Sequence, residues 1–240
     1  MIVSPPLNAR ASAPLNARNF VLAPSDLTFL WDGCKRCFYN KVIHKYAPPR
    51  GVFPSIFTQI DSAMKTFYTD CRTDAITPDL PPGKVIYGDS WLETRPINLP
   101  GINSTVTLRG KMDTALRFDD GSYGIVDFKT ANPKPEFVAF YGRQLHAYAF
   151  AAENAAPGKL AFTPVKRLGL IVFEPSRYKQ KEDSAYFGGN LNWIEIPRDD
   201  EAFLAFLSEV VATLEKPTAP HGATDCTNCD YRDRARRTGL

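Results

Sequence analysis

Three scarcities in the 240-residue sequence narrow what this chain can be. Cysteine is scarce, with five residues, too few for a disulfide-stapled secreted domain of this length. The net charge is small, at +3. A nucleic-acid partner would therefore have to bind to a local basic patch, not to the overall charge of the molecule. There is no run of about 20 apolar residues, and the first residues lack the basic-then-apolar order of a signal peptide. We therefore expect a cytoplasmic protein without a membrane partner.

What remains has the composition of an ordinary globular domain. With 44% apolar and 23% charged residues, the chain can bury a core. Residues 1–20 contain the segment PLNAR twice, in a setting rich in proline and alanine and without an apolar period. We expect a flexible tail there. Residues 21–240 are expected to form a single domain.

The hydrophobic pattern predicts helices, an antiparallel sheet, and then further helices and strands. Helical periodicity marks residues 25–46 (one helix or a broken pair), 54–71, 136–155 and 200–216. Strands are predicted at residues 84–87, 91–97, 105–118, 122–130, 167–176 and 192–198. This order indicates a mixed α/β (α+β) layer architecture.

Two carboxylates and a lysine interrupt the strands of one predicted hairpin. Residues 119–121, Asp-Asp-Gly, fit a three-residue turn closed by glycine in the left-handed region. In that register Asp113 lies opposite Asp127 on one face, with Lys129 one step along the same face. Two carboxylates this close repel each other, and burial would raise the pKa of one of them. A nearby positive charge is needed to keep both ionised.

A divalent cation would supply that charge. Mg²⁺ and Mn²⁺ take hard oxygen ligands, commonly one or two carboxylates together with substrate phosphate. Lys129 can orient an attacking water or stabilise the charge that grows in the transition state. The set predicts metal-assisted phosphodiester hydrolysis. The alternative is a solvated strand face on which Asp113, Asp127 and Lys129 form exposed ion pairs.

Three segments in this order resemble the RecB-like branch of the PD-(D/E)XK nuclease superfamily, which includes CRISPR-associated exonucleases and helicase-linked repair nucleases. RGKMD, ending at Asp113, resembles the G-x-x-D strand of that branch; IVDFKT resembles its (D/E)-x-K strand, and QLHAY its Q-x-x-x-Y helix. The resemblance extends from about Ser25 to Tyr231. It implies a restriction-endonuclease-like core, with a central mixed sheet flanked by helices.

The resemblance also implies roles for individual residues. The metal ligands would be Asp113, Asp127 and the main-chain carbonyl of Phe128. Lys129 would be the catalytic lysine. Gln144 and Tyr148, four residues apart on one helical face, would position metal waters or DNA phosphate. Without the hairpin, a partly buried helix face would be the favoured interpretation of these two residues.

One departure from the family pattern concerns the helix predicted at 54–71. The family usually has a His or Glu on an early helix as a further metal ligand, whereas this segment offers only Gln59 and Asp61. Asp61 can complete the metal site chemically, and it can equally be a solvated helix residue.

Four of the five cysteines form two C-x-x-C pairs, Cys34/Cys37 and Cys226/Cys229. A shared four-thiolate clasp would join the N-terminal and C-terminal segments, and would suit zinc or an iron-sulfur cluster. The resemblance favours [4Fe-4S], because many RecB-like nucleases have one early and three late cysteines; here Ala235 stands in the place of a late cysteine, and Cys37 would replace it. Independent reduced cysteines are the alternative.

Together these features predict a Mg²⁺- or Mn²⁺-dependent DNA nuclease. We expect an exonuclease on single-stranded or end-bearing DNA, acting in repair, recombination or defence, with a helicase or another repair protein as a possible partner. Arginines after the last cysteine can contact phosphates or form a solvated tail: Arg232, Arg234, Arg236 and Arg237. The alternatives are a non-catalytic DNA-binding or scaffold subunit, and a zinc-clasped interaction protein.

Overall fold

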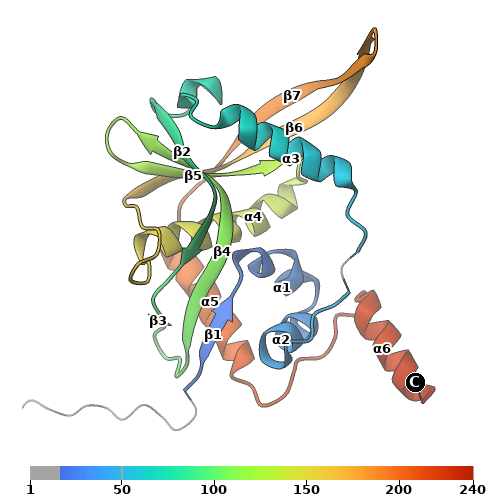
Figure 1. The fold of residues 1–240 in the computed structure, drawn as a ribbon. Helices are drawn as coiled ribbons and strands as arrows, with labels where there is room; N and C mark the ends of the chain where they lie inside the picture. The colour runs from blue at the N-terminus through green and yellow to red at the C-terminus, as the bar shows by residue number, and fades with distance from the viewer. Residues whose placement is uncertain (1–16, 50, 240) are drawn as a thin grey trace, which may run out of the picture.

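The computed structural model describes residues 17–49 and 51–239, which form a twisted sheet with helices on both faces (Figure 1). The strands are β1 (Asn19–Leu22), β2 (Gly83–Glu93), β3 (Ile97–Asn98), β4 (Thr105–Phe118), β5 (Tyr123–Lys129), β6 (Val165–Lys181) and β7 (Ser184–Ile196). The α-helices are α1 (Phe29–Gly33), α2 (Lys35–His44), α3 (Ser55–Tyr68), α4 (Pro135–Glu153), α5 (Asp200–Leu214) and α6 (Thr227–Arg237). Short 3-10 turns, η1 and η2, cover Pro24–Leu27 and Thr73–Ala75. None of the helices in these two ranges is long and apolar enough to cross a membrane.

Strand β4 organises the sheet. It pairs in parallel with β1 and antiparallel with β2, β3 and β5. Strand β5 continues through α4 to β6, which lies parallel to it, and β7 closes the sheet antiparallel to β6. The sheet is therefore mixed, with helices against it, and the predicted fold class is confirmed.

Most predicted elements are present, with changes in their bounds. For residues 25–46 the sequence predicted either one helix or a broken pair, and the structure has the broken pair. The break is at Cys34, which has extended backbone angles between α1 and α2. The strands predicted at 84–87 and 91–97 are instead one strand, β2, followed by the short β3. Strands β6 and β7 run well beyond 167–176 and 192–198 into residues that are exposed on both faces and so lack the alternation that marks a strand.

Two elements were not predicted. Helix α6 contains the arginines that sequence analysis placed in a basic end or tail, and it buries only Cys229, so its sequence has almost no apolar period. Strand β1 begins at Asn19, so the last two residues of the predicted tail pair with β4. Residues 1–16, the rest of that tail, lie outside the described residues.

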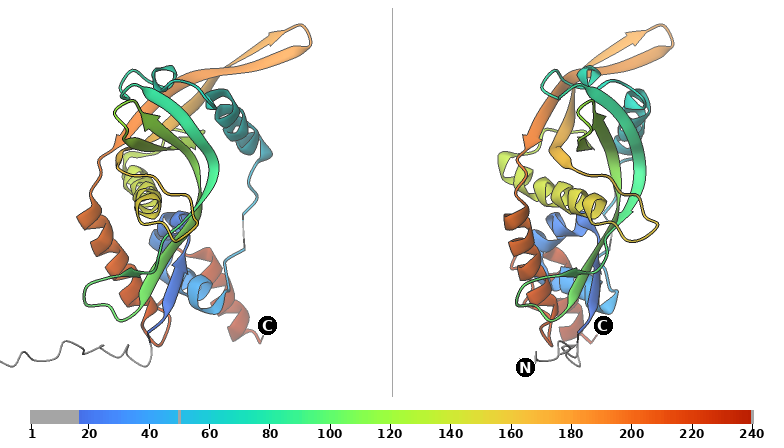
Figure 2. Two further views of the ribbon diagram at one scale, coloured as in Figure 1. Left: turned by 60° about the vertical axis from the view of Figure 1, so that its left-hand side comes forward. Right: turned by 90° about the vertical axis from the view of Figure 1, so that its left-hand side faces the viewer.

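Apolar layers cover both faces of the sheet. Ile125 of β5 packs with Leu145 and Ala149 of α4, whereas its neighbour Val126 packs with Tyr68 of α3. Because successive strand residues point to opposite faces, α4 and α3 lie on opposite sides of β5. Figure 2 shows the curved sheet wrapping around α4. A further cluster joins β1 and the start of β4 to α1, α2 and α5.

Candidate active site and cysteine cluster

The predicted β4–β5 hairpin is present in the predicted register. Its four paired positions all have residue numbers that sum to 240. Gly121 closes the turn with φ +84°, a conformation that glycine adopts without the steric cost of a side chain. The pairing ends at Thr114 and Val126. Asp113 and Asp127, the next pair in register, therefore lie where the two strands separate.

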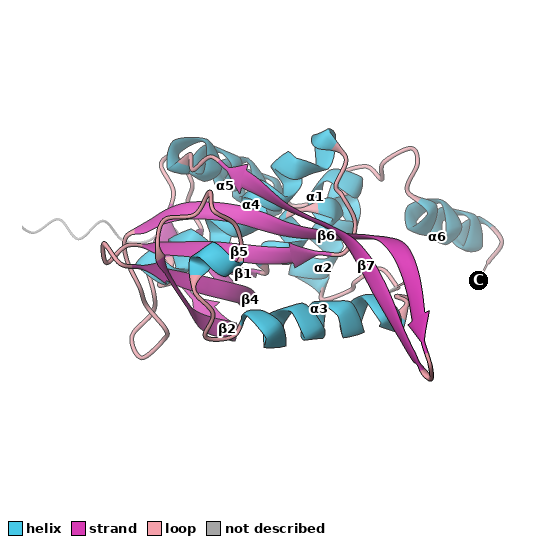
Figure 3. Cartoon of the chain, turned by 90° about the horizontal axis from the view of Figure 1, so that it is seen from above, coloured by secondary structure: helices cyan, strands magenta, loops and turns pink. Residues whose placement is uncertain are grey.

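A pocket of about 580 Å³ lies at this separation. Asp113, Asp127, Phe128 and Lys129 all line it, together with residues of η1, α1, α3 and α4. Helix α3 runs alongside the strands (Figure 3), and its residues Phe57, Thr58 and Asp61 form one wall of the pocket. The hairpin thus directs its two carboxylates and its ammonium group into one cavity.

Asp127 lies in the buried part of this site, with 4% of the residue exposed. Its Oδ2 forms an ion pair with Lys129 Nζ, and its Oδ1 accepts a hydrogen bond from Gln144 Nε2 at 3.3 Å. Burial raises the pKa of Asp127 to about 6, and the neighbouring Asp113 adds to this rise while Lys129 opposes it. The ammonium of Lys129 lies 4.4 Å from the ring centroid of Tyr141.

Asp113 is held from two directions. Its Oδ2 accepts a hydrogen bond from the backbone N–H of Phe128 at 3.3 Å, which ties it to β5. Its Oδ1 accepts one from Lys65 Nζ at 2.8 Å, which ties it to α3. Because Asp113 also lines the pocket, both contacts leave it facing the cavity that it shares with Asp127.

Lys65 is a site residue that sequence analysis missed. Its Nζ lies 2.9 Å from Asp61 Oδ2 and 3.1 Å from Asp89 Oδ1, as well as close to Asp113. Burial disfavours its charge, but the hydrogen bonds to Asp113 and Asp61 outweigh burial and raise the pKa of Lys65. The available signal was the i, i+4 spacing of Asp61 and Lys65 on one helix face.

The remaining predicted site residues divide. Gln144 and Asp61 line the pocket, whereas Gln59 is exposed on α3 and does not. Tyr148 does not line it either: its ring is buried in the core beneath α4, and its hydroxyl donates to the carbonyl of Lys111 at 2.7 Å. Tyr148 therefore fixes α4 against β4 and does not face the cavity.

The donor set suits a hard divalent cation. Three carboxylates, those of Asp61, Asp113 and Asp127, line the pocket. Two ammonium groups face them: Lys129 pairs with Asp127, and Lys65 is shared between Asp61 and Asp113. One negative charge is left over, and Mg²⁺ or Mn²⁺ would balance it and replace Lys65 at the shared oxygens. The main-chain carbonyl of Phe128 belongs to a lining residue between the second acid and the lysine. The residues present fit the predicted metal.

Aromatic side chains form another part of the pocket wall. Phe29, Phe53, Phe57 and Tyr141 all line it. Phe53 is 70% exposed, and its ring centroid lies 5.6 Å from that of Phe57. Phe29 lies 5.3 Å from Tyr141, edge to face, and is also exposed. Aromatic faces beside a phosphodiester site are surfaces on which unpaired bases can stack.

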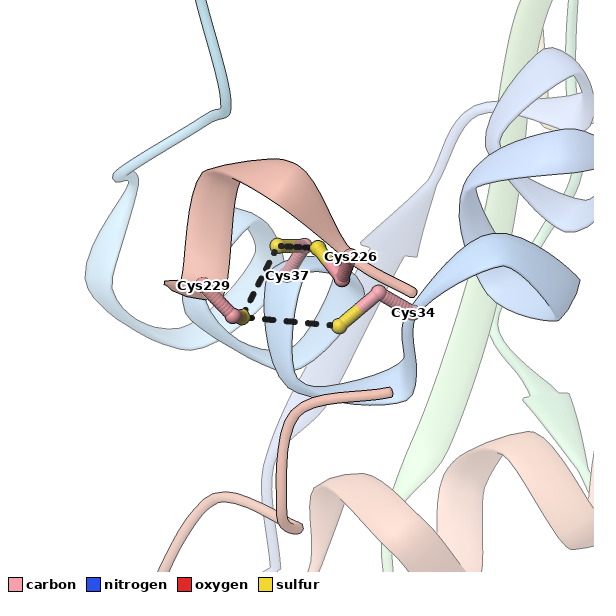
Figure 4. A group of neighbouring side chains, drawn as sticks. All are labelled: Cys34, Cys37, Cys226 and Cys229. Carbon is pink, nitrogen blue, oxygen red and sulfur yellow. Dashed lines mark hydrogen bonds between the residues drawn. The ribbon is translucent and has the colours of Figure 1, made fainter. Parts of the chain in front are cut away.

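The four predicted cysteines meet in one cluster, which Figure 4 shows. All four Sγ atoms lie within 4.8 Å of one another, and three Sγ–Sγ distances are 3.6, 3.6 and 3.7 Å. Cys34 and Cys226 are the N-caps of α2 and α6, and Cys37 and Cys229 lie in the first turns. The positive ends of two helix dipoles therefore favour the thiolate form that metals bind.

The surroundings of the cluster support a metal site. Burial raises the pKa of Cys37 and of Cys229. At Cys34, hydrogen bonds from the backbone of Ala223 and Cys37 and from the neighbouring thiols outweigh burial and lower the pKa to about 7. A Cβ on Gly222 would lie 3.0 Å from Cys229 Sγ, so glycine permits this close approach. Asn228 Nδ2 donates to Cys37 Sγ at 3.3 Å, an outer contact of the kind that orients a metal ligand.

The spacing of the sulfurs indicates how many metal ions they can share. A Zn–S bond of about 2.3 Å in a tetrahedron places its sulfurs about 3.8 Å apart. The observed closest separations of 3.6 to 3.7 Å match that value. In a [4Fe-4S] cluster each thiolate binds a different iron, so the four sulfurs must stand farther apart. The other three separations also lie within 4.8 Å, so the spacing favours one shared ion over a cluster of four irons.

Comparison with known proteins gives one family. A family model described as the PD-(D/E)XK nuclease superfamily matches residues 62–234. A solved structure described as "Crystal structure of SSO0001" is 16% identical, with 82% of this chain and 77% of that chain covered and a TM-score of 0.45. A likeness at that distance carries no argument about function. No curated protein matches the chain.

Proposed function

This chain belongs to the PD-(D/E)XK nuclease superfamily, and on that premise we propose that it is a Mg²⁺- or Mn²⁺-dependent deoxyribonuclease that hydrolyses phosphodiester bonds. The observation that carries the proposal is the convergence of Asp113, Asp127 and Lys129 in one pocket. An ordinary solvated strand face would not bury Asp127 or raise its pKa. This argues against the alternative of exposed ion pairs.

Each polar residue has a distinct role in the proposed site. Asp113, Asp127 and the carbonyl of Phe128 would hold the metal, which when bound supplies charge stabilisation and an activated water. Gln144 fixes the orientation of Asp127 through its hydrogen bond to Oδ1. Lys129 places a positive charge where the attacked phosphate gains negative charge. Lys65 neutralises Asp113 in the metal-free protein and would compete with the metal for that carboxylate.

The proposed substrate is DNA with unpaired bases or free ends. Phe29 and Phe53, exposed at the pocket wall, support a single-stranded substrate, because every base offers a face for stacking. A paired duplex keeps its bases stacked on one another and cannot offer them to these rings. An exonuclease that works on ends or single strands would use both features of the pocket, the metal ligands and the aromatic wall.

At the cysteines we propose one structural zinc ion. Sequence analysis favoured [4Fe-4S] over zinc because of the family resemblance, but the sulfur spacing supports a single ion. All four positions are thiolates, which leaves no ligand position open for catalysis. The ion would hold α6 to α2. Metal analysis together with the visible spectrum tests this assignment: a colourless protein with one zinc supports it, and a brown protein with iron and sulfide contradicts it.

A second candidate function is a DNA-binding subunit without activity. Its support is specific: Asp61, the acid on α3 that could complete the metal site, is ion-paired with Lys65 at 2.9 Å. Lys65 also pairs with Asp113, at 2.8 Å. If both pairs persist in solution, Asp127 is the one of these three acids that Lys65 does not occupy.

One experiment separates the two candidates. The protein is incubated with labelled single-stranded and double-stranded DNA and Mn²⁺, beside the variants Asp127→Asn and Lys129→Met. Loss of cleavage by about 10³-fold in both variants supports the nuclease. The matched control is Asp119→Asn, a carboxylate in the turn of the same hairpin, paired with Arg72 outside the pocket. Cleavage that survives in the Asp127 variant contradicts the proposal, and binding without any cleavage supports the subunit.

A further inference from the structure

The β6–β7 hairpin extends far beyond the sheet. Lys129, the last residue of β5, pairs with Val172 of β6, and β6 then continues for nine residues to Lys181. At about 3.3 Å per residue this is a projection of about 30 Å. Figure 1 shows the ribbon reaching away from the rest of the fold. Residues 174–187, here called the arm, are all exposed.

The arm keeps large aromatic side chains in solvent. Tyr178, Tyr186 and Phe187 are 61%, 59% and 60% exposed. Tyr178 and Phe187 contact each other across the ribbon, with ring centroids 5.7 Å apart. A two-stranded ribbon without a core beneath it is only marginally stable, so aromatic pairs help to hold its strands together. Tyr186 is exposed as well and is not part of this pair, and an exposed aromatic residue of this kind indicates a binding surface.

One face of the arm is basic. Arg177, Lys179 and Lys181 alternate along β6 and so share a face, and Tyr186 is the cross-strand partner of Lys179. The acidic residues of the arm's tip, Glu182 and Asp183, lie in the turn between the two strands. The third acidic residue of the arm, Glu174, lies at its base, opposite Asn190. Positive charge and an aromatic ring are therefore gathered along the middle of the arm, and negative charge stands at its two ends.

These cations are not used inside the protein. Within the part of the chain that the structure describes, the ion pairs made by β6 involve Lys166 and Arg167, near its start, and none involves the cations of the arm. Gly188, opposite Arg177, has open space where a Cβ would stand. The basic face is thus free of internal partners and open to a ligand with regularly spaced negative charges.

The arm also leaves the sheet at the pocket. Strand β5 carries Asp127 and Lys129 at its C-terminal end, and the parallel strand β6 leaves the sheet in the same direction. Figure 3, viewed from above, shows the arm continuing past the end of β5. A chain held in the pocket therefore has the arm beside it as it leaves.

We propose that the arm binds the backbone of the DNA strand whose scissile bond lies in the pocket. Arg177, Lys179 and Lys181 neutralise successive phosphates, and Tyr186 stacks on an unpaired base. Charge complementarity selects a nucleic acid, because the basic face offers cations in a row with an aromatic ring among them. The inference deepens the proposed function, on which it rests, by naming how the substrate strand is held.

The test removes the charge of the face while keeping its shape. The triple variant Arg177→Gln, Lys179→Gln, Lys181→Gln is titrated with a fluorescent oligothymidylate of about 30 nucleotides, with Ca²⁺ in place of Mn²⁺, at several salt concentrations. We expect the Kd to rise at least about tenfold, and the slope of log K against log salt to fall by about 2, the value for three lost contacts to a single strand. Tyr186→Ala is expected to weaken binding by about fivefold or more.

A matched control removes equal charge elsewhere. The triple variant Lys84→Gln, Lys159→Gln, Lys166→Gln changes exposed lysines that pair with surface carboxylates outside the arm. We expect its Kd to stay within about twofold of wild type. If the arm variant binds as tightly as this control, or if the control loses as much as the arm variant, the inference is wrong. Equal thermal unfolding of all variants shows that folding is not the cause.

Failure of this inference is distinguishable from failure of the proposed function. Binding is measured without chemistry, so an arm-dependent Kd in a protein that never cleaves DNA would uphold the arm and overturn the nuclease. Cleavage that depends on Asp127 but is unchanged in the arm variant would do the reverse. If the arm instead docks another protein, DNA binding is unaffected by all of its variants, which also overturns the inference.

Discussion

The carboxylate pocket and the cysteine cluster are two candidate metal sites built on opposite principles. The pocket draws its two central carboxylates from adjacent strands of one hairpin, uses oxygen donors, and lies in a cavity with exposed aromatic residues. The cluster draws sulfur donors from helices at the two ends of the domain, and three of its four cysteines are buried. The two central carboxylates are brought together by one hairpin, which depends on local sequence. The four cysteines are brought together only when the whole chain folds.

The difference teaches what each metal would do. Hard oxygen ligands in an open cavity keep water on the ion and exchange it readily, as catalysis requires. Four thiolate ligands, three of them from buried cysteines, leave no open position and would hold the ion permanently, as a structural link requires. Arg36 of α2 supports that link through a bidentate pair with Asp233 of α6, at 2.8 and 3.2 Å. Loss of one metal should therefore stop chemistry, and loss of the other should loosen the fold.

The largest expected effect comes from breaking the cluster. Cys229→Ser should remove the ion, because the site loses one of its four thiolates, and metal binding of this kind contributes on the order of 10 kcal/mol to folding. A loss of even a few kcal/mol lowers Tm by roughly 10 °C in a chain of this size. Calorimetry and zinc content measure the outcome.

The matched control for this change is Cys71→Ser, since Cys71 lies outside the cluster. It should leave both zinc content and Tm as they are. Hydrogen exchange adds a local readout: α6, which buries only Cys229, should lose protection in the Cys229 variant before the sheet does. Equal behaviour of the two variants would contradict the structural role of the cluster.

A chelator should remove metal from the pocket much faster than from the cysteine cluster. EDTA is expected to stop cleavage at once, and excess Mg²⁺ should restore it fully, because the pocket is accessible. Zinc in the thiolate cluster should remain bound over the same interval. The measurement is cleavage before and after chelation, with zinc content followed in parallel. Simultaneous loss of zinc and activity that Mg²⁺ cannot restore would show that the two sites are not independent.

The pH dependence of the pocket should be steep on the acid side. Burial raises the pKa of Asp127 to about 6 in the metal-free protein, so below that pH a proton competes with the metal. The apparent affinity for Mn²⁺ is expected to fall by about tenfold per pH unit below 6 and to level off above 7. Titrations with Mn²⁺ across this range measure it, and Asp127→Asn should abolish the slope.

The same group makes an opposite contribution to folding. Because burial raises the folded pKa of Asp127 above its ordinary value of 3.8, the metal-free folded state holds the proton more tightly than the unfolded chain does. The contribution of Asp127 to stability is therefore present at low pH and is lost as pH rises from about 4 to about 6. Unfolding of metal-free wild type and Asp127→Asn across this window isolates it: the difference between the two should change with pH.

The smallest expected effect concerns Lys65. Lys65→Met should leave Asp61, Asp89 and Asp113 without their shared cation, so Mn²⁺ binding becomes tighter by roughly fivefold while the metal-free protein loses stability. The control is Lys111→Met, because Lys111 is more exposed and contacts only Asp89 of these three. Calorimetric titration with Mn²⁺ compares the two. Weaker metal binding in the Lys65 variant would mean that Lys65 positions Asp113 more than it competes with the metal.

Features that depend on residues close together in the sequence could be predicted, and features that depend on the packing of distant segments could not. The turn at residues 119–121 fixes the hairpin register by local backbone geometry, so the opposition of Asp113 and Asp127 could be predicted. The extent of β6 and β7 could not, because the arm has no buried face to impose alternation. Gln144 could be placed from its helix, whereas Tyr148, on the same helix, points into the core.

By itself the sequence determined the mixed α/β class, the hairpin with its opposed acids, and the two cysteine pairs, because each depends on periodicity, turn chemistry or short spacing. Only the tertiary structure decided that α3 brings Lys65 to Asp113, that the four sulfurs stand close enough to share one ion, and that the arm leaves the sheet beside the pocket. These are contacts between segments far apart in the chain, and they depend on how whole elements pack, which no local pattern encodes.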